Sequence, residues 1–131
     1  MQIHTFRLKP GQDLLGEIEA FVAAKNIEAG CVLSSVGSLT HATLRLANRN
    51  DLNDYERHFE ILSLNGTVST HGSHLHISIS DGDGRTIGGH LVSGCKIYTT
   101  AELVIAVFED VIYQREFAED SGYEELSISH R

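Results

Sequence analysis

The chain has 131 residues, a hydrophobic fraction of 41% and a formal net charge of −8 at pH 7. This length suits a single domain, residues 1–131, with a hydrophobic core of its own. An acidic chain with scattered Lys and Arg is a poor candidate for strong non-specific nucleic-acid binding, because that binding depends on a basic surface that neutralises phosphates.

The N-terminal part of the sequence predicts one strand followed by one helix. Residues 1–8 alternate well enough for a strand, which Pro10 and Gly11 end. Asp13 is a suitable N-cap for a helix that runs to about Asn26. The apolar residues of this segment recur at helical spacing: Leu14, Leu15, Ile18, Phe21 and Val22. This segment has the clearest helical pattern in the sequence.

From Gly30 onwards the pattern is that of β-strands almost throughout. Besides a hairpin described below, we expect strands at residues 31–36, 42–47, 59–68, 103–113 and 124–129. Residues 103–113 fit a helix or a strand by periodicity alone, and their β-branched and aromatic side chains favour the strand. Gly37 and Ser38 are expected to interrupt the chain between the first two, and residues 48–54 form a polar loop. One helix with about seven or eight strands defines an α+β domain, in which the main helix packs on a mostly antiparallel sheet. Residues 104–107 are apolar on both sides, which predicts a second sheet layer or a subunit interface.

A predicted hairpin over residues 74–93 carries three histidines and is the most informative segment. His74 and His76 project from one face of the first strand, because side chains alternate sides with period 2, and apolar residues line the other face. A three-residue loop, residues 82–84, pairs His76 with His90 and places all three imidazoles on one face. A two-residue loop would shift the register by one and turn His90 to the apolar side. The three-residue loop keeps both faces consistent, and we prefer it.

The three imidazoles predict a metal site with His74, His76 and His90 as ligands. Three histidines bind zinc with one coordination position vacant, and imidazole also suits iron, copper or nickel. We therefore expect a divalent metal, zinc first, with the other three as alternatives. The competing interpretation is that these polar-face histidines are hydrogen-bonded to neighbours or to water. Glu102 is the first choice for a fourth ligand or a base, although an exposed charge at a strand end is the simpler interpretation.

The cysteines and the N-terminus bear on the compartment. Cys31 and Cys95 are isolated and lack the spacing of a metal or redox pair, so we expect reduced, buried thiols. The first ten residues lack the apolar region of a signal peptide, and no stretch approaches the roughly 20 apolar residues that span a bilayer. These features predict a cytoplasmic protein without a membrane partner.

Several segments resemble the plant-and-prokaryote conserved (PPC) domain family. They are V-G-S-L-T-H-A-T-L-R (36–45), F-E-I-L-S-L-N-G-T (59–67), H-L-H-I-S-I-S-D-G-D-G-R-T-I-G-G-H-L (74–91) and G-C-K-I-Y-T-T-A-E-L-V-I (94–105). The resemblance covers nearly the whole chain in order. It implies an α+β fold with a mostly antiparallel sheet, assembled as a homotrimer. The stand-alone prokaryotic members share the His-x-His and Gly-Gly-His elements, which implies a metal at the three histidines.

The plant members of this family differ from the chain in two ways. Their domain is attached to an AT-hook, an Arg-Gly-Arg-Pro type minor-groove binder, and this sequence contains no such motif. They also carry a G-R-F-E-I-L interaction core, where residues 57–62 here read R-H-F-E-I-L. The resemblance therefore implies a stand-alone prokaryotic member, for which neither intrinsic DNA binding nor plant-type partner binding is expected.

Three hypotheses of function follow. The preferred one is a homotrimeric, metal-containing binding or regulatory module, recruited to nucleoprotein or protein partners, with weak or no DNA affinity of its own. The alternative is a small metalloenzyme whose metal activates water or polarises a carbonyl. In the third hypothesis the histidines have a purely structural role and stabilise a subunit interface, with or without metal. An open, exchangeable coordination position favours catalysis or ligand sensing, and a closed one favours structure.

Overall fold

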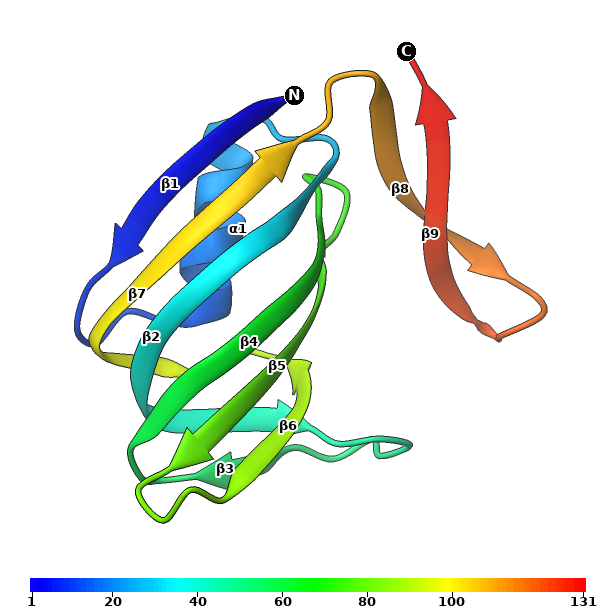
Figure 1. The fold of residues 1–131 in the computed structure, drawn as a ribbon. Coiled ribbons are helices and arrows are strands. Elements are labelled where there is room, and N and C mark those ends of the chain that lie inside the picture. Colours follow the sequence, from blue (N-terminus) through cyan, green and yellow to red (C-terminus); the bar gives the residue numbers. More distant parts are fainter.

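The computed structural model describes all 131 residues and contains one helix and nine strands (Figure 1). The elements are β1 (Gln2–Leu8), α1 (Leu14–Ala24), β2 (Gly30–Arg45), β3 (Asn53–Tyr55), β4 (Phe59–Val68), β5 (His74–Asp81), β6 (Thr86–Leu91), β7 (Lys96–Val107), β8 (Val111–Ala118) and β9 (Tyr123–His130). Every strand pairing is antiparallel, which confirms the predicted α+β class with nine strands in place of seven or eight.

The helix begins where the sequence predicts. The side chain of Asp13 accepts a hydrogen bond of 2.9 Å from the backbone N–H of Gly16, so it caps one of the free donors of the first turn. α1 ends at Ala24, because Asn26 adopts a left-handed conformation with φ 51°, a common way to end a helix. At 11 residues α1 is the only helix, and it is not long and apolar enough to cross a membrane.

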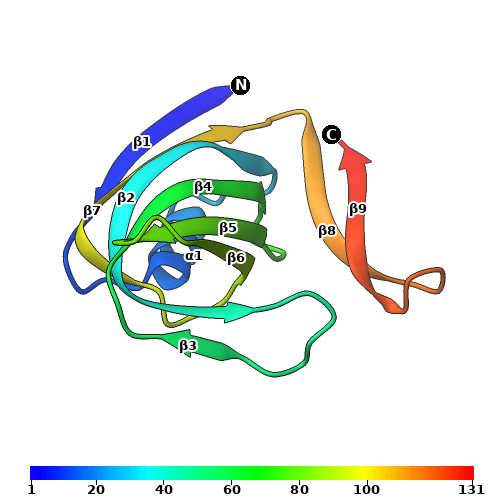
Figure 2. The same cartoon turned by 60° about the horizontal axis from the view of Figure 1, so that its bottom comes forward.

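Seven strands form one curved sheet that wraps around α1 (Figure 2). Its order is β1-β7-β2-β4-β5-β6, with β3 paired to β2. The far end of β2 also pairs with β6, so the sheet curls back on itself there. The core lies between the sheet and the helix, where Leu14, Ile18 and Val22 of α1 are buried among apolar strand residues.

Two expectations about the strands are wrong. β2 is one strand of 16 residues that runs through Gly37, where a break was expected. A Cβ on Gly37 would lie 2.3 Å from the carbonyl oxygen of Thr100, so this glycine permits a close approach of β7. Register shifts around Leu39 bend the strand without ending it. In addition, the apolar stretch 103–113 contributes to two strands, because a turn at residues 108–110 separates β7 from β8.

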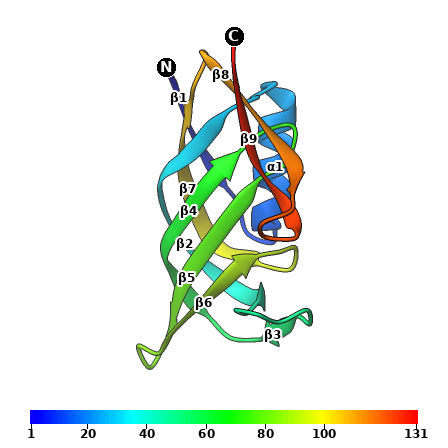
Figure 3. The ribbon, with the colours of Figure 1, turned by 90° about the vertical axis from the view of Figure 1, so that its right-hand side faces the viewer.

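β8 and β9 form a separate two-stranded hairpin (Figure 1) and lie in front of the sheet when the molecule is viewed from that side (Figure 3). The base of this hairpin is tied to the segment before β2. The N–H of Tyr113 donates to the carbonyl of Glu28 at 2.9 Å, and the Glu28 carboxylate pairs with Arg131. The hydrogen bond from Arg131, together with one from His71, lowers the pKa of Glu28. The hairpin is therefore anchored to the rest of the domain at its base.

Candidate metal centre

The β5–β6 hairpin has the predicted three-residue loop and the predicted register. Gly84 adopts φ 79°, and the N–H of Asp81 donates to the carbonyl of Arg85 at 2.9 Å. The Asp81 carboxylate accepts hydrogen bonds from the backbone N–H groups of Asp83 and Arg85, which fixes the turn. As a result His76 lies directly opposite His90, and the register prediction is confirmed.

The three histidines converge on the polar face of this hairpin. Their candidate ligand nitrogens all lie within 4.8 Å of one another, and Nε2 of His74 is 3.2 Å from Nε2 of His76. His74 and His76 are exposed and His90 is half-buried, whereas the alternating residues Leu75 and Ile77 are buried in the core. The strand period therefore separates the imidazoles from the core, as expected.

The surroundings of His74 and His90 favour the neutral imidazole, which is the form that binds metals. Partial burial lowers the pKa of His74 and His90, and nearby groups lower it further, His76 and then Arg115 at His74 and Arg45 at His90. Nδ1 of His90 is buried and has no hydrogen-bond partner. Such an atom is costly to leave unsatisfied, and coordination of a cation through it would satisfy it. The donor set and this orphaned nitrogen thus fit a divalent metal.

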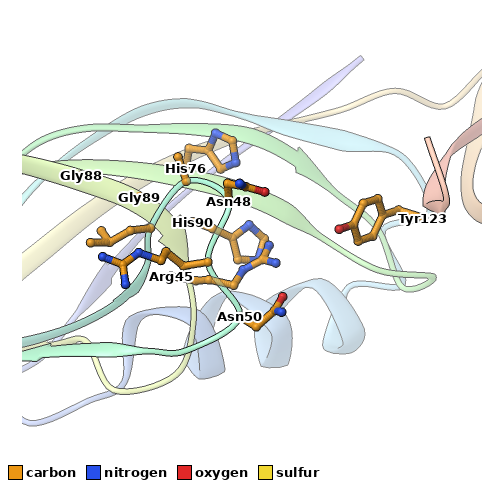
Figure 4. Close-up of a pocket in the computed structure, with 11 residues that line it drawn as sticks. Arg45, Asn48, Asn50, His76, Gly88, Gly89, His90 and Tyr123 are labelled. Carbon is orange, nitrogen blue, oxygen red and sulfur yellow. The ribbon is translucent and has the colours of Figure 1, made fainter. Parts of the chain in front are cut away.

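A cavity of about 520 Å³ opens beside His76 and His90 (Figure 4). Gly88 and Gly89 of β6 and the loop after β2 line one part of it, and Tyr123 of β9 lines another. A neighbouring cavity on the His74 side is lined by hairpin residues that include Arg115 and Glu125. The β8–β9 hairpin therefore forms part of the surroundings of the histidine cluster. The sequence around the histidines does not indicate that this hairpin lies near them, because residues 111–130 begin more than 20 positions after His90.

Arg45 is the residue of this centre that sequence reasoning missed. It lines both cavities and lies opposite His90 on the other side of β6. Its guanidinium, unlike those of Arg49 and Arg57, makes no ion pair within the chain. The sequence shows Arg45 only as one of several scattered basic residues. The pairing of the end of β2 with β6, which brings it to the centre, follows from the curl of the whole sheet.

Other residues that the sequence suggested lie elsewhere. Glu102 is exposed on β7 opposite Arg7 and Val36, and β2 and β4 separate its strand from β5. It is therefore placed away from the histidines, which do not gain a fourth ligand or a base from it. Cys31 and Cys95 are both free, as expected, although only Cys95 is fully buried, and burial raises the pKa of its thiol to about 11.

The comparisons with known proteins identify the family. The model of the Plants and Prokaryotes Conserved (PCC) domain matches residues 1–109, and the chain belongs to this family. It is 45% identical over 128 residues to a Synechococcus protein named bifunctional protein GlmU, covering 98% of this chain and 21% of that one. It is 34% identical to the AT-hook motif nuclear-localized protein 13 of Arabidopsis thaliana, covering 72% of this chain and 25% of that one. The chain thus spans about a fifth to a quarter of the length of these curated relatives.

Solved structures show the same fold. A protein from Salmonella enterica aligns with a TM-score of 0.98 and 38% identity, over 99% of this chain and 94% of the other. A protein from Archaeoglobus fulgidus described as metal-containing aligns with a TM-score of 0.79 and 27% identity, over 97% and 94%. A candidate DNA-binding protein from Bacteroides thetaiotaomicron aligns with a TM-score of 0.84 and 23% identity, over 95% and 91%, and shows likeness of fold alone.

Proposed function

We propose that this PPC-domain protein binds one divalent metal ion through His74, His76 and His90. The observation that carries the proposal is the convergence of three imidazoles whose candidate ligand nitrogens lie within 4.8 Å of one another. One of the three, His90, also has a buried nitrogen without a hydrogen-bond partner. The description of the Archaeoglobus relative as metal-containing supports it. Zinc is the first choice, since it accepts three histidines and leaves one position for water or a ligand, and iron, copper or nickel are the alternatives.

Elemental analysis of untagged protein, purified without chelators, tests this metal proposal. We expect close to one metal ion per chain in the wild type and a large loss in a variant that combines His76→Ala with His90→Ala. His58→Ala is the matched control, because this histidine packs against Tyr98 with the two rings tilted and their centroids 4.3 Å apart, and it lies outside the cluster. Equal metal content in all three proteins would show that the ion binds elsewhere, and its absence from all three would leave the histidines without a metal.

The protein acts, on this account, as a homotrimeric binding or regulatory module of the cytoplasm. Its surface supports self-association, because Ile3, Leu33 and Leu62 on strands β1, β2 and β4 are each at least half exposed, as is Phe117 on the hairpin. Light scattering coupled to gel filtration should therefore give three times the chain mass of 14.4 kDa. Leu62→Glu should lower that mass. A particle with the mass of one chain would contradict the trimer.

The same proposal assigns the protein weak or no DNA affinity of its own, so that a role on DNA requires a partner. Relatives carry DNA-related descriptions, but this chain has a net charge of −8 and no AT-hook motif. Fluorescence anisotropy with a duplex oligonucleotide at physiological salt should show a Kd no tighter than the roughly 10⁻⁴–10⁻⁶ M of non-specific binding. Tight, salt-sensitive binding would contradict this proposal.

A small metalloenzyme is the second candidate function. The observation that favours it is the cavity beside His76 and His90, which would give a substrate room next to a metal held by the three histidines. In such an enzyme the metal would activate water or polarise a carbonyl. A bound ion that exchanges readily and changes its spectrum with an added ligand would support this function, whereas an ion that does neither would favour a structural role.

A further inference from the structure

The cavity beside the histidines has a charge opposite to that of the protein as a whole. Its charged and polar lining consists of two arginines, two asparagines, two histidines and one tyrosine, without any carboxylate. This lining belongs to a chain with a net charge of −8. The cavity volume of about 520 Å³ lies in the range of small-molecule sites. A small anion is the ligand that such a lining would favour.

Arg45 is placed in the same row as two of the metal ligands. On β6, His90 pairs with His76 on one side and with Arg45 on the other. Residues directly opposite each other in antiparallel strands project from the same face, with Cβ atoms roughly 4.5–5.5 Å apart. The side chains of Arg45 and His90 therefore leave the sheet next to each other on the same face, and both residues line the same cavity (Figure 4).

The guanidinium of Arg45 also lacks a partner of its own. Arg49, which lines the same cavity, pairs with Asp51 at 4.0 Å, and Arg115 donates to the hydroxyl of Thr67 at 3.1 Å. Arg45 is half-buried and makes no side-chain hydrogen bond or ion pair. A guanidinium presents five N–H donors in a fixed fork that matches an oxyanion, and those of Arg45 are free to bind one.

We infer that this cavity binds a small molecule through its carboxylate or phosphate group, with Arg45 holding the oxyanion next to the metal. This inference rests on the proposed metal centre, whose open position would take a further oxygen of the same ligand. Glu124 and Glu125 line the neighbouring cavity on the His74 side and balance the charges of Arg45 and Arg115 there, whereas the first cavity has no carboxylate. The ligand is therefore expected on the other side, between Gly88 and Asn48.

Anion titrations of Co²⁺-loaded protein test the inference, with pyruvate as the carboxylate probe and inorganic phosphate as the phosphate probe. Calorimetry gives the Kd, the visible spectrum reports ligands that reach the cobalt, and elemental analysis gives the cobalt content. We expect Arg45→Gln to weaken binding of the preferred anion by about tenfold or more, because charge-assisted hydrogen bonds are lost. Cobalt content should not change. Arg85→Gln is the matched control and should bind within about twofold of the wild type, since this arginine is exposed and lines neither cavity.

The relative affinity of the two probes distinguishes carboxylate from phosphate. Equal affinities in the wild type and Arg45→Gln would overturn the inference, as would no binding of either anion at roughly 10 mM, where even millimolar ligands are largely bound. If cobalt is not retained, the metal proposal fails, and the same titrations are followed by NMR on metal-free protein. Shifts of the Gly88 and Gly89 amides that require Arg45 would then sustain the anion site, and their absence would overturn it.

Discussion

Gly89→Ala tests the strand pairing that brings Arg45 and His90 together. A Cβ at position 89 would lie 2.8 Å from the carbonyl oxygen of Arg45 and 3.4 Å from Cβ of Leu44. The first distance is shorter than the roughly 3.3–3.6 Å of close C···O contacts, so the end of β2 must move by about half an ångström. Overpacking of this kind costs about 1–3 kcal/mol.

Gly82→Ala is the matched control for this substitution. Gly82 lies in the β5–β6 loop with nothing within 4 Å of an added Cβ, and its φ is not positive. Both substitutions gain about 0.4–1 kcal/mol from the lower entropy of the unfolded chain, so this gain cancels in the comparison. We therefore expect Gly89→Ala to be less stable than Gly82→Ala by about 1–3 kcal/mol, which is the overpacking cost alone.

Urea unfolding of the two metal-free variants measures this difference directly, and metal affinity provides a second readout. Because the strain falls between Arg45 and His90, Gly89→Ala should also weaken metal binding, on the order of tenfold, as loss of supporting contacts does at other metal sites. Equal stability of the two variants, with unchanged metal affinity in both, would refute the close β2–β6 approach on which the geometry of the centre depends.

Three further predictions follow from the titrating groups. Folding lowers the pKa values of His74 and His90, so the unfolded chain binds protons more tightly than the folded one. The free energy of unfolding of the metal-free protein should therefore fall as the pH drops below about 6.5. Urea unfolding at a series of pH values should show a smaller fall in a His74→Gln, His90→Gln variant, and an identical fall would contradict the lowered pKa values. Iodoacetamide at pH 8 should modify Cys31 before Cys95, because the Cys95 thiol is buried and its pKa is raised to about 11. Mass spectrometry of the native protein measures the order of modification, and the reverse order would contradict the burial of Cys95. Glu28→Gln should increase amide hydrogen exchange in the β8–β9 hairpin by removing the ion pair with Arg131, whereas unchanged exchange would show that the backbone bonds at its base suffice.

The hairpin with the histidines could be predicted because its information is local. The alternation of residues 74–80 fixes which side chains face the core, and the loop with a left-handed Gly84 fixes the register by which His76 meets His90. The cap at Asp13 is a similar local signal. Short-range rules were sufficient wherever the partners lie within one turn or one hairpin.

The remaining features depend on partners that are distant in sequence. Gly37 was expected to break a strand, but its role is set by Thr100 on another strand, which approaches too closely for a side chain. Arg45 reaches the centre only because the whole sheet curls and pairs β2 with β6. Glu102 was a candidate for a fourth ligand, but two other strands separate its strand, β7, from β5. No periodicity in the sequence carries this information.

X-ray absorption at the metal edge of protein purified without added metal tests the central claim most directly. The account predicts one ion per chain, with a first shell of three imidazole nitrogens at roughly 2.0–2.1 Å if the ion is zinc, and one further light-atom ligand. The same measurement on His76→Ala, His90→Ala protein should show no such shell. A first shell without imidazole scattering, or an unchanged spectrum in the variant, would contradict a centre built from His74, His76 and His90.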